Sequence, residues 1–235
     1  MRALTLRRDG VAIVETYLDD AACTALLDEI HAYAARHELP LIVREDGERA
    51  LRYKVIDGDA IHEDLPSLVA LYERVGALVR ASDATLIPLP NRTASVNVNL
   101  TPPGGEYRWH YDRNAVTAIL FLNSVGGGET EMYANHRLRL GRAKDTLAQR
   151  ALDRIWRFFT RFTAPLVVAP APGRMIVMRG DRCLHSVRRV TGIEERINVI
   201  MTFDTPGARF RAEENLDPYL YSKTATPDFD PNYRG

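Results

Sequence analysis

Hydrophobic residues in the first third of the chain recur every three to four positions in two places, which predicts two amphipathic helices. One follows a pair of aspartates, which are candidate N-caps, and the other opens at Pro66, a residue favoured at the first helical position. Short β-branched runs predict strands at 10–18 and 42–56, the second broken by a polar hairpin at 44–49. We therefore expect residues 1–93 to form a mixed α/β lead-in.

From residue 94 onward the period of the pattern changes to two. Residues 95–100 alternate strictly between polar and apolar side chains, as a half-buried strand does. Further short strands, separated by glycine and proline turns, are predicted at 116–122, 129–133, 166–169, 174–178, 184–190 and 196–203. Many short strands at this spacing indicate a mainly β fold with flanking helices, either a β-sandwich or a jelly roll.

The length of 235 residues fits a single domain, 1–235, that contains all of these parts. After the lead-in we expect a β-core over 94–204, interrupted by a helical insertion at 143–163. The remaining stretch, 205–235, is rich in proline, aspartate and tyrosine and is predicted to form an irregular C-terminal arm.

Composition narrows the function classes only slightly. The 31 lysines and arginines balance 31 aspartates and glutamates, and a net charge of zero argues against nucleic-acid binding by the chain as a whole. No apolar stretch has the length of a signal peptide core or a membrane span, so we expect no membrane association. Cys23 and Cys183 lie in apolar stretches and predict buried free thiols in a cytoplasmic protein.

Three residues form a candidate metal-binding set. His110 and Asp112 stand two apart, so in an extended chain both side chains point to the same face. His185 lies 75 residues later in a separate predicted strand, and strands distant in sequence meet in a jelly roll. A His-x-Asp pair alone is common and usually has no metal role. Two imidazoles and one carboxylate, however, are the ligand set of non-haem Fe(II) oxygenases, which leaves coordination positions open.

Arg196 strengthens this interpretation. It opens the alternating strand at 196–203 and places a permanent charge among valine, isoleucine and phenylalanine. Such a placement is costly unless the guanidinium meets an anion. A dicarboxylate ligand would supply that anion through a bidentate, charge-assisted pair.

Several linked stretches together resemble the Fe(II)/2-oxoglutarate-dependent dioxygenases, particularly the branch with a prolyl 4-hydroxylase-like catalytic domain. The matching stretches are 103–112 (PGGEYRWHYD), 119–123 (ILFLN), 127–130 (GGET), 172–178 (PGRMIVM) and 184–187 (LHSV). The resemblance covers about residues 94–204 and implies a double-stranded β-helix, the cupin-like jelly roll.

The resemblance also implies cofactors and a reaction. His110, Asp112 and His185 would hold Fe(II), while Arg196 would bind the C5 carboxylate of the co-substrate 2-oxoglutarate. With dioxygen, such a site hydroxylates a C–H bond and releases succinate and CO2. Related halogenases replace the carboxylate ligand by a small residue, so the presence of Asp112 favours hydroxylation. Desaturation, epoxidation and cyclisation remain open with the same triad.

Weaker candidates surround the co-substrate. Tyr107 matches a tyrosine that lines the pocket in related hydroxylases, although it would equally pack under the glycine turn. Asn97 and Asn99 share one strand face and would bind co-substrate or substrate if that face points inward rather than to water. Thr202 shares a strand face with Arg196 and is a candidate for holding the same carboxylate.

The substrate is the least determined part of the prediction. Arg113 and Asn114 directly follow the triad carboxylate and are candidate substrate contacts. Because the chain has no obvious peptide-binding module, the leading hypothesis is hydroxylation of a free small molecule, such as an amino acid or a biosynthetic intermediate. The alternatives are a peptidyl or carrier-protein-bound residue and, least favoured, a non-enzymatic cupin-like binding domain.

The insertion before His185 departs from the family pattern. Residues 137–161 carry eight basic residues against two acidic ones, a net charge of +6. Arginines recur at helical spacing opposite apolar residues, which predicts an amphipathic helix at 144–162. The arginines are Arg150, Arg154, Arg157 and Arg161, and the apolar residues are Leu147, Ala151, Ile155 and Phe158. This helix is interpreted either as a solvated surface element or as a docking surface or lid for an anionic partner.

Overall fold

The computed structural model describes residues 6–44, 51–138 and 146–206. All but the first residue of the polar hairpin expected at 44–49 and nearly all of the predicted C-terminal arm at 205–235 lie outside these residues. The first residues of the predicted insertion helix also lie outside them.

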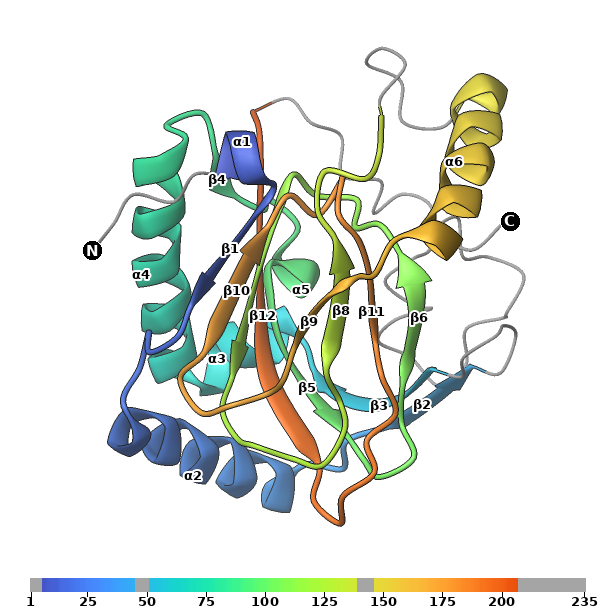
Figure 1. Cartoon of the computed structure of the whole chain (residues 1–235). Helices are drawn as coiled ribbons and strands as arrows, with labels where there is room; N and C mark the ends of the chain where they lie inside the picture. The colour runs from blue at the N-terminus through green and yellow to red at the C-terminus, as the bar shows by residue number, and fades with distance from the viewer. Residues whose placement is uncertain (1–5, 45–50, 139–145, 207–235) are drawn as a thin grey trace.

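Two antiparallel sheets face each other within the described part of the chain (Figure 1). The major sheet has eight strands there, in the order β1 (Val11–Val14), β10 (Met175–Met178), β7 (Val116–Phe121), β12 (Arg196–Asp204), β5 (Val96–Thr101), β3 (Leu51–Ile56) and β2 (Leu41–Arg44), with β4 (Ile87–Pro88) beside β12. The minor sheet has the order β6 (Tyr107–His110), β11 (Leu184–Val187), β8 (Thr130–Tyr133) and β9 (Leu166–Val168). This is the double-stranded β-helix, or jelly roll, that the sequence predicted.

Helices cover the outer face of the major sheet, and the main core lies between them (Figure 1). Helix α2 (Asp20–Arg36) follows Asp19, whose carboxylate accepts a hydrogen bond from the N–H of Ala22 and so caps the first turn. Helix α4 (Pro66–Ser82) begins at the predicted proline. The short helices α1 (Leu6–Asp9), α3 (Gly58–Asp64) and α5 (Arg92–Ser95) complete the lead-in.

Alternation along the central strand β12 separates the core from the site. One set of its side chains, which includes Ile197, Val199 and Met201, points outward into the main core under the helices. The other set begins with Arg196 and Asn198 and points into the space between the sheets. One strand therefore supplies packing on one face and polar groups on the other.

Apolar residues close one side of the space between the sheets. This cluster contains buried residues from both sheets, namely Ile119, Phe121, Met132, Val168, Ile176, Met178 and Cys183. Cys23 and Cys183 are both buried free thiols, as predicted. Within the described residues, no helix has the length and apolar composition that crossing a bilayer requires.

The insertion forms helix α6 (Leu147–Phe159) and a 3-10 turn, η1 (Thr160–Phe162), at the edge of the minor sheet (Figure 1). The helix is amphipathic, but its apolar side faces away from the protein: Leu147 is 82% exposed and Ile155 is 57% exposed. The opposite side docks through polar contacts. Arg137 and Asp153 form a bidentate ion pair with distances of 2.6 and 3.1 Å.

Candidate metal centre

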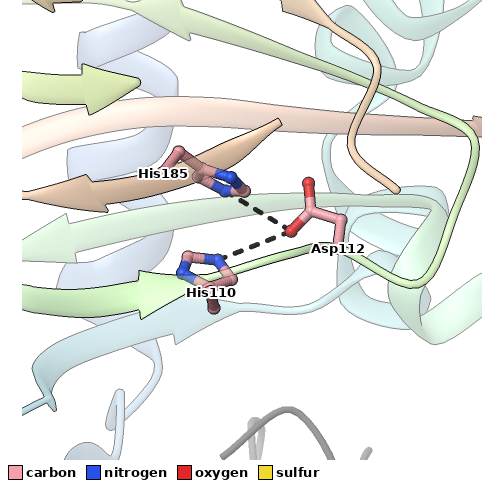
Figure 2. Close-up of side chains that lie close together, drawn as sticks. All are labelled: His110, Asp112 and His185. Atoms are coloured by element: carbon pink, nitrogen blue, oxygen red, sulfur yellow. Dashed lines mark ion pairs between the residues drawn. The ribbon is translucent and has the colours of Figure 1, made fainter. Parts of the chain in front are cut away.

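Two histidines meet across adjacent strands of the minor sheet. His110 ends β6 and is the direct antiparallel register partner of His185 in β11, with ring centroids 4.0 Å apart. Asp112 lies just beyond β6, where its N–H donates to the carbonyl of Gly180 at 2.9 Å. One ligand atom from each of the three residues lies within 4.8 Å of the others (Figure 2). The structure thus brings together the three residues that the sequence proposed as metal ligands.

Hydrogen bonds fix how both rings present their nitrogens. Nδ1 of His110 lies 2.9 Å from the carbonyl oxygen of Arg108, and Nδ1 of His185 lies 3.0 Å from that of Cys183. A carbonyl oxygen only accepts, so each Nδ1 carries a proton, and Nε2 is the ring nitrogen that can bind a metal. The two Nε2 atoms point at the same oxygen of Asp112, Oδ1, at 3.5 Å (Figure 2).

Electrostatics favours the metal-binding protonation states of Asp112 and His185. Burial by itself would raise the pKa of Asp112, but His185, His110 and the hydroxyl of Thr117 together lower that pKa well below its usual range. Burial, assisted by the neighbouring His110, lowers the pKa of His185 to about 4. The carboxylate is therefore ionised and His185 is neutral at physiological pH, as metal ligation requires.

Arg196 lines the same cavity as the two histidines and is 3% exposed. Its guanidinium donates to Thr130 Oγ1 at 3.2 Å and to the side-chain oxygen of Asn198, and its Cζ lies 5.0 Å from the ring centroid of Phe121. Burial lowers the pKa of Arg196 to about 10, so the group stays charged at neutral pH. Arg196 Nε has no hydrogen-bond partner among the described residues. The arrangement is a buried cation that faces a cavity, and it suits an anionic ligand.

All of the weaker sequence candidates line this cavity, namely Asn97, Asn99, Tyr107, Arg113, Asn114 and Thr202. Asn99 stands opposite Asn198 across β5 and β12, which places it on the inner rather than the water-facing side of the sheet. Tyr107 packs against the ring of His110 with centroids 4.6 Å apart, and Tyr53 lies 6.1 Å from Tyr107. Both tyrosines form an aromatic wall next to the candidate metal ligands.

The geometry does not support two of the detailed roles. Thr202 lies six residues along β12 from Arg196, a separation of roughly 20 Å at the rise of a strand, so one small dicarboxylate cannot reach both. The single hydrogen of the Thr202 hydroxyl instead points towards the carbonyls of Ala94, at 2.8 Å, and Ser95, at 3.1 Å. The Asn114 side chain is buried and directs its amide hydrogens into the protein, which differs from the substrate contact that the sequence suggested.

Two threonines of the site are among the residues that sequence reasoning did not find. Thr117 contacts the carboxylate of Asp112 and Thr130 contacts Arg196, each through its hydroxyl. Thr117 is a single polar residue in the apolar run at 116–122, and that interruption was the available signal. Thr130 belongs to the stretch 127–130 that carries the family resemblance, but the stretch gave no reason to assign it a contact.

No family model and no curated protein matches this chain, whereas many solved structures do. The carbocyclase SnoK from nogalamycin biosynthesis, described as non-heme and alpha-ketoglutarate-dependent, matches with a TM-score of 0.65, 13% identity, and coverage of 87% of this chain and 85% of that one. The chain has the fold of the Fe(II)/2-oxoglutarate-dependent oxygenases.

Two further matches have the same fold with different bound molecules. The epimerase SnoN, in complex with Fe3+, alpha ketoglutarate and nogalamycin RO, gives a TM-score of 0.62 at 18% identity, over 86% of this chain and 81% of that one. A prolyl hydroxylase from Trichoplax adhaerens, in complex with a hypoxia inducible factor peptide fragment, gives a TM-score of 0.62 at 14% identity, over 87% and 88%. In this oxygenase fold, the donor set of His110, Asp112 and His185 fits a facially bound iron ion.

Proposed function

We propose that the protein is a non-haem Fe(II)/2-oxoglutarate-dependent dioxygenase that hydroxylates an unactivated C–H bond of a small molecule. The reaction consumes 2-oxoglutarate and dioxygen and yields the alcohol, succinate and CO2. One observation carries the proposal: two imidazoles and an ionised carboxylate converge in the cavity that also contains the buried cation Arg196. A purely structural site has no need for that combination.

The residues have distinct roles in this proposal. His110, Asp112 and His185 would hold the iron, which supplies the oxidising chemistry when 2-oxoglutarate and dioxygen are present. Arg196 would bind the distal carboxylate of 2-oxoglutarate, because its charge is already desolvated and oriented by Thr130 and Asn198. Asn97, Asn99 and the Tyr107 ring line the remaining cavity and would orient the co-substrate or substrate.

The reaction type is supported by the complete triad, since Asp112 supplies the carboxylate that a hydroxylase needs. SnoN and SnoK, which have matching folds, are described as an epimerase and a carbocyclase. The first alternative to hydroxylation is therefore desaturation or cyclisation at the same site. The Trichoplax prolyl hydroxylase is in complex with a peptide fragment. The second alternative is therefore a peptidyl or carrier-bound substrate. We favour a small molecule because SnoN binds nogalamycin RO with the same fold.

A spectroscopic experiment tests the proposal without knowledge of the substrate. Anaerobic addition of Fe(II) and 2-oxoglutarate to the metal-free protein is expected to produce a weak visible charge-transfer band, and Asp112→Ala is expected to lose it. The matched control is the same titration with succinate, which lacks the chelating 2-oxo group and should give no band. Absence of the band at saturating Fe(II) and 2-oxoglutarate contradicts the proposal.

We also propose that α6 binds an acidic protein surface, such as that of a partner carrying the substrate. Support comes from the exposed apolar side chains of α6 and the following turn η1, which include Phe162 at 72% exposure, and from the exposed Arg154 and Arg161. An acidic partner with apolar residues complements both. The double variant Arg154→Glu, Arg161→Glu should lower turnover of the native substrate, and unchanged turnover contradicts this docking role.

Two broader assignments complete the proposal. We propose that residues 1–235 act as one domain, because the helices of the lead-in and the major sheet share the main core. We also propose a cytoplasmic location, which the two buried free thiols support. Expression of residues 94–206 without the lead-in is expected to give an insoluble protein, and a folded product would contradict the single-domain assignment.

A further inference from the structure

A chain of two hydrogen-bond donors stands behind the carboxylate of Asp112, on the side away from the histidines. The hydroxyl of Thr117 donates to Oδ2 of Asp112 at 2.5 Å. The side-chain amide of Asn114 donates to Thr117 Oγ1 at 2.9 Å and to the backbone carbonyl of Val116 at 2.6 Å. Thr117 is 3% exposed and Asn114 is 4% exposed, so water does not compete with these bonds.

The chemistry of the three groups determines which atom donates in each of these hydrogen bonds. The carbonyl of Val116 only accepts, so the atom of Asn114 that faces it is the amide nitrogen. The second hydrogen of that nitrogen points at Thr117 and occupies a lone pair of its oxygen. A hydroxyl has one hydrogen to donate, and the hydrogen of Thr117 is thereby left for Asp112.

As a result, the two oxygens of the Asp112 carboxylate have different partners. Oδ2 accepts from Thr117, while Oδ1 lies 3.5 Å from Nε2 of both His110 and His185 (Figure 2). Gly180 closes the remaining side: a Cβ at that position would lie 2.8 Å from Asp112 Oδ2 and 2.8 Å from Thr117 Oγ1. The carboxylate is therefore held from behind by Thr117 and from the side by the backbone.

We propose that Asn114 and Thr117 are positioning residues that present Asp112 to the metal through Oδ1 alone. The inference deepens the proposed function and rests on it only in requiring that a metal binds at the triad. It gives Asn114 a role in the metal centre in place of the substrate contact expected from its sequence position. With one carboxylate oxygen committed elsewhere, one more coordination position stays open for the other ligands.

The test measures affinity for the metal alone, by anaerobic titration of Fe(II) into metal-free protein and by the visible spectrum of the Co(II) form. Thr117→Val keeps the shape but removes the donor, and it is expected to weaken metal binding by about 10- to 100-fold. Thr117→Ser keeps the hydroxyl and is expected to stay within about 3-fold of the wild type, on the same reasoning. The Co(II) spectrum should change for the valine variant and not for the serine variant. Equal affinities and spectra for the two variants would overturn the inference.

A double-mutant cycle separates positioning from a general loss of stability. Because Asn114 acts through the Thr117 hydroxyl, Asn114→Ala should weaken metal binding in the wild-type background and have little further effect beside Thr117→Val. Additive losses would overturn the proposal, because they would show that the two residues act independently. Asn114→Ala also serves as the second variant if Thr117→Val does not fold.

The outcomes distinguish this inference from the proposed function. A wild-type protein that binds no Fe(II) or Co(II) at the triad overturns both. A wild-type protein that binds metal, with a Thr117→Val variant that binds it equally well, overturns only the positioning role. Thermal unfolding of the metal-free variants completes the test: a drop in melting temperature without a change in metal affinity marks Thr117 as merely structural and also overturns the inference.

Discussion

His110 and His185 are direct register partners on two neighbouring antiparallel strands, and each ring is held by a backbone carbonyl of its own chain segment. The spacing of the two candidate ligands is therefore set by the hydrogen-bond ladder of the minor sheet. Asp112 joins them from the loop after β6, fixed by its N–H bond to Gly180. A site built in this way is rigid before any ligand arrives, which favours metal binding.

Removal of the carboxylate tests the triad directly. Asp112→Ala deletes the only acidic group of the three and should reduce 2-oxoglutarate-dependent succinate release to the level without enzyme. Succinate release and Fe(II) affinity are the measurements, and circular dichroism checks that the fold is intact. Retention of succinate release by a folded variant contradicts the role of Asp112.

Replacement of the buried cation tests co-substrate binding. Arg196→Ala should raise the apparent KM for 2-oxoglutarate by about 10- to 150-fold, the equivalent of a charged hydrogen-bond pair worth about 1.5–3 kcal/mol, with a smaller effect on kcat. Arg174→Ala is the matched control, since Arg174 pairs with the exposed Glu15 outside the cavity. A similar KM for both variants would show that Arg196 does not bind the co-substrate.

The buried hydroxyl of Tyr72 is expected to make the free energy of unfolding depend on pH. This hydroxyl donates to the carbonyl of Thr202 at 2.8 Å and accepts from the N–H of Leu89 at 3.0 Å, so Tyr72→Phe should lower the free energy of unfolding by about 1–3 kcal/mol at pH 8. Burial raises the pKa of Tyr72 to about 12, above its usual value near 10. The contribution is therefore complete below pH 10 and is lost as the pH rises towards 12.

Urea unfolding of the wild type and Tyr72→Phe between pH 8 and pH 12 measures this dependence. The difference in unfolding free energy between the two proteins should shrink through that window. Because other tyrosines titrate equally in both proteins, only the difference reports on Tyr72. A constant difference would contradict the assigned cause.

The bidentate ion pair of Arg137 with Asp153 predicts how α6 is attached. Both side chains are largely shielded, at 15% and 16% exposure, so Asp153→Asn should loosen the helix without lowering the stability of the main core. Trypsin cleaves after arginine, and α6 carries several, so limited proteolysis should cut within 147–162 faster in the variant. Glu15→Gln, which alters an exposed pair elsewhere, should leave the cleavage rate unchanged.

Much of the fold followed from the sequence because alternation and helix signals were strong. The switch to period two near residue 94, the proline that opens α4 and the glycine-bounded strands each correspond to an observed element. The observed β11 (Leu184–Val187) is shorter than the predicted strand at 184–190. Its register shifts between His185 and Val187, an irregularity that hydrophobic pattern does not encode.

Less of the site's detail was predictable. The four residues His110, Asp112, His185 and Arg196 stand out by type and spacing, and they do lie around one cavity. The hydrogen bond from Thr117 to Asp112 depends on the path of the short loop between β6 and β7. A pattern of hydrophobic and polar residues along the sequence does not predict that path. The orientation of α6 was also missed, because the pattern shows that a helix is amphipathic but not which side docks.

The alternation along β12 has a consequence for how this protein can evolve. Its nine residues serve the helix-covered core on one face and the cavity on the other. A single inserted or deleted residue would exchange the two sets of side chains and bring a guanidinium into the core. A length change within this strand is therefore expected to destabilise the fold unless a β-bulge absorbs it. New substrate preferences must arise by substitution at its inward positions or by remodelling of the surrounding loops, where insertions are tolerated.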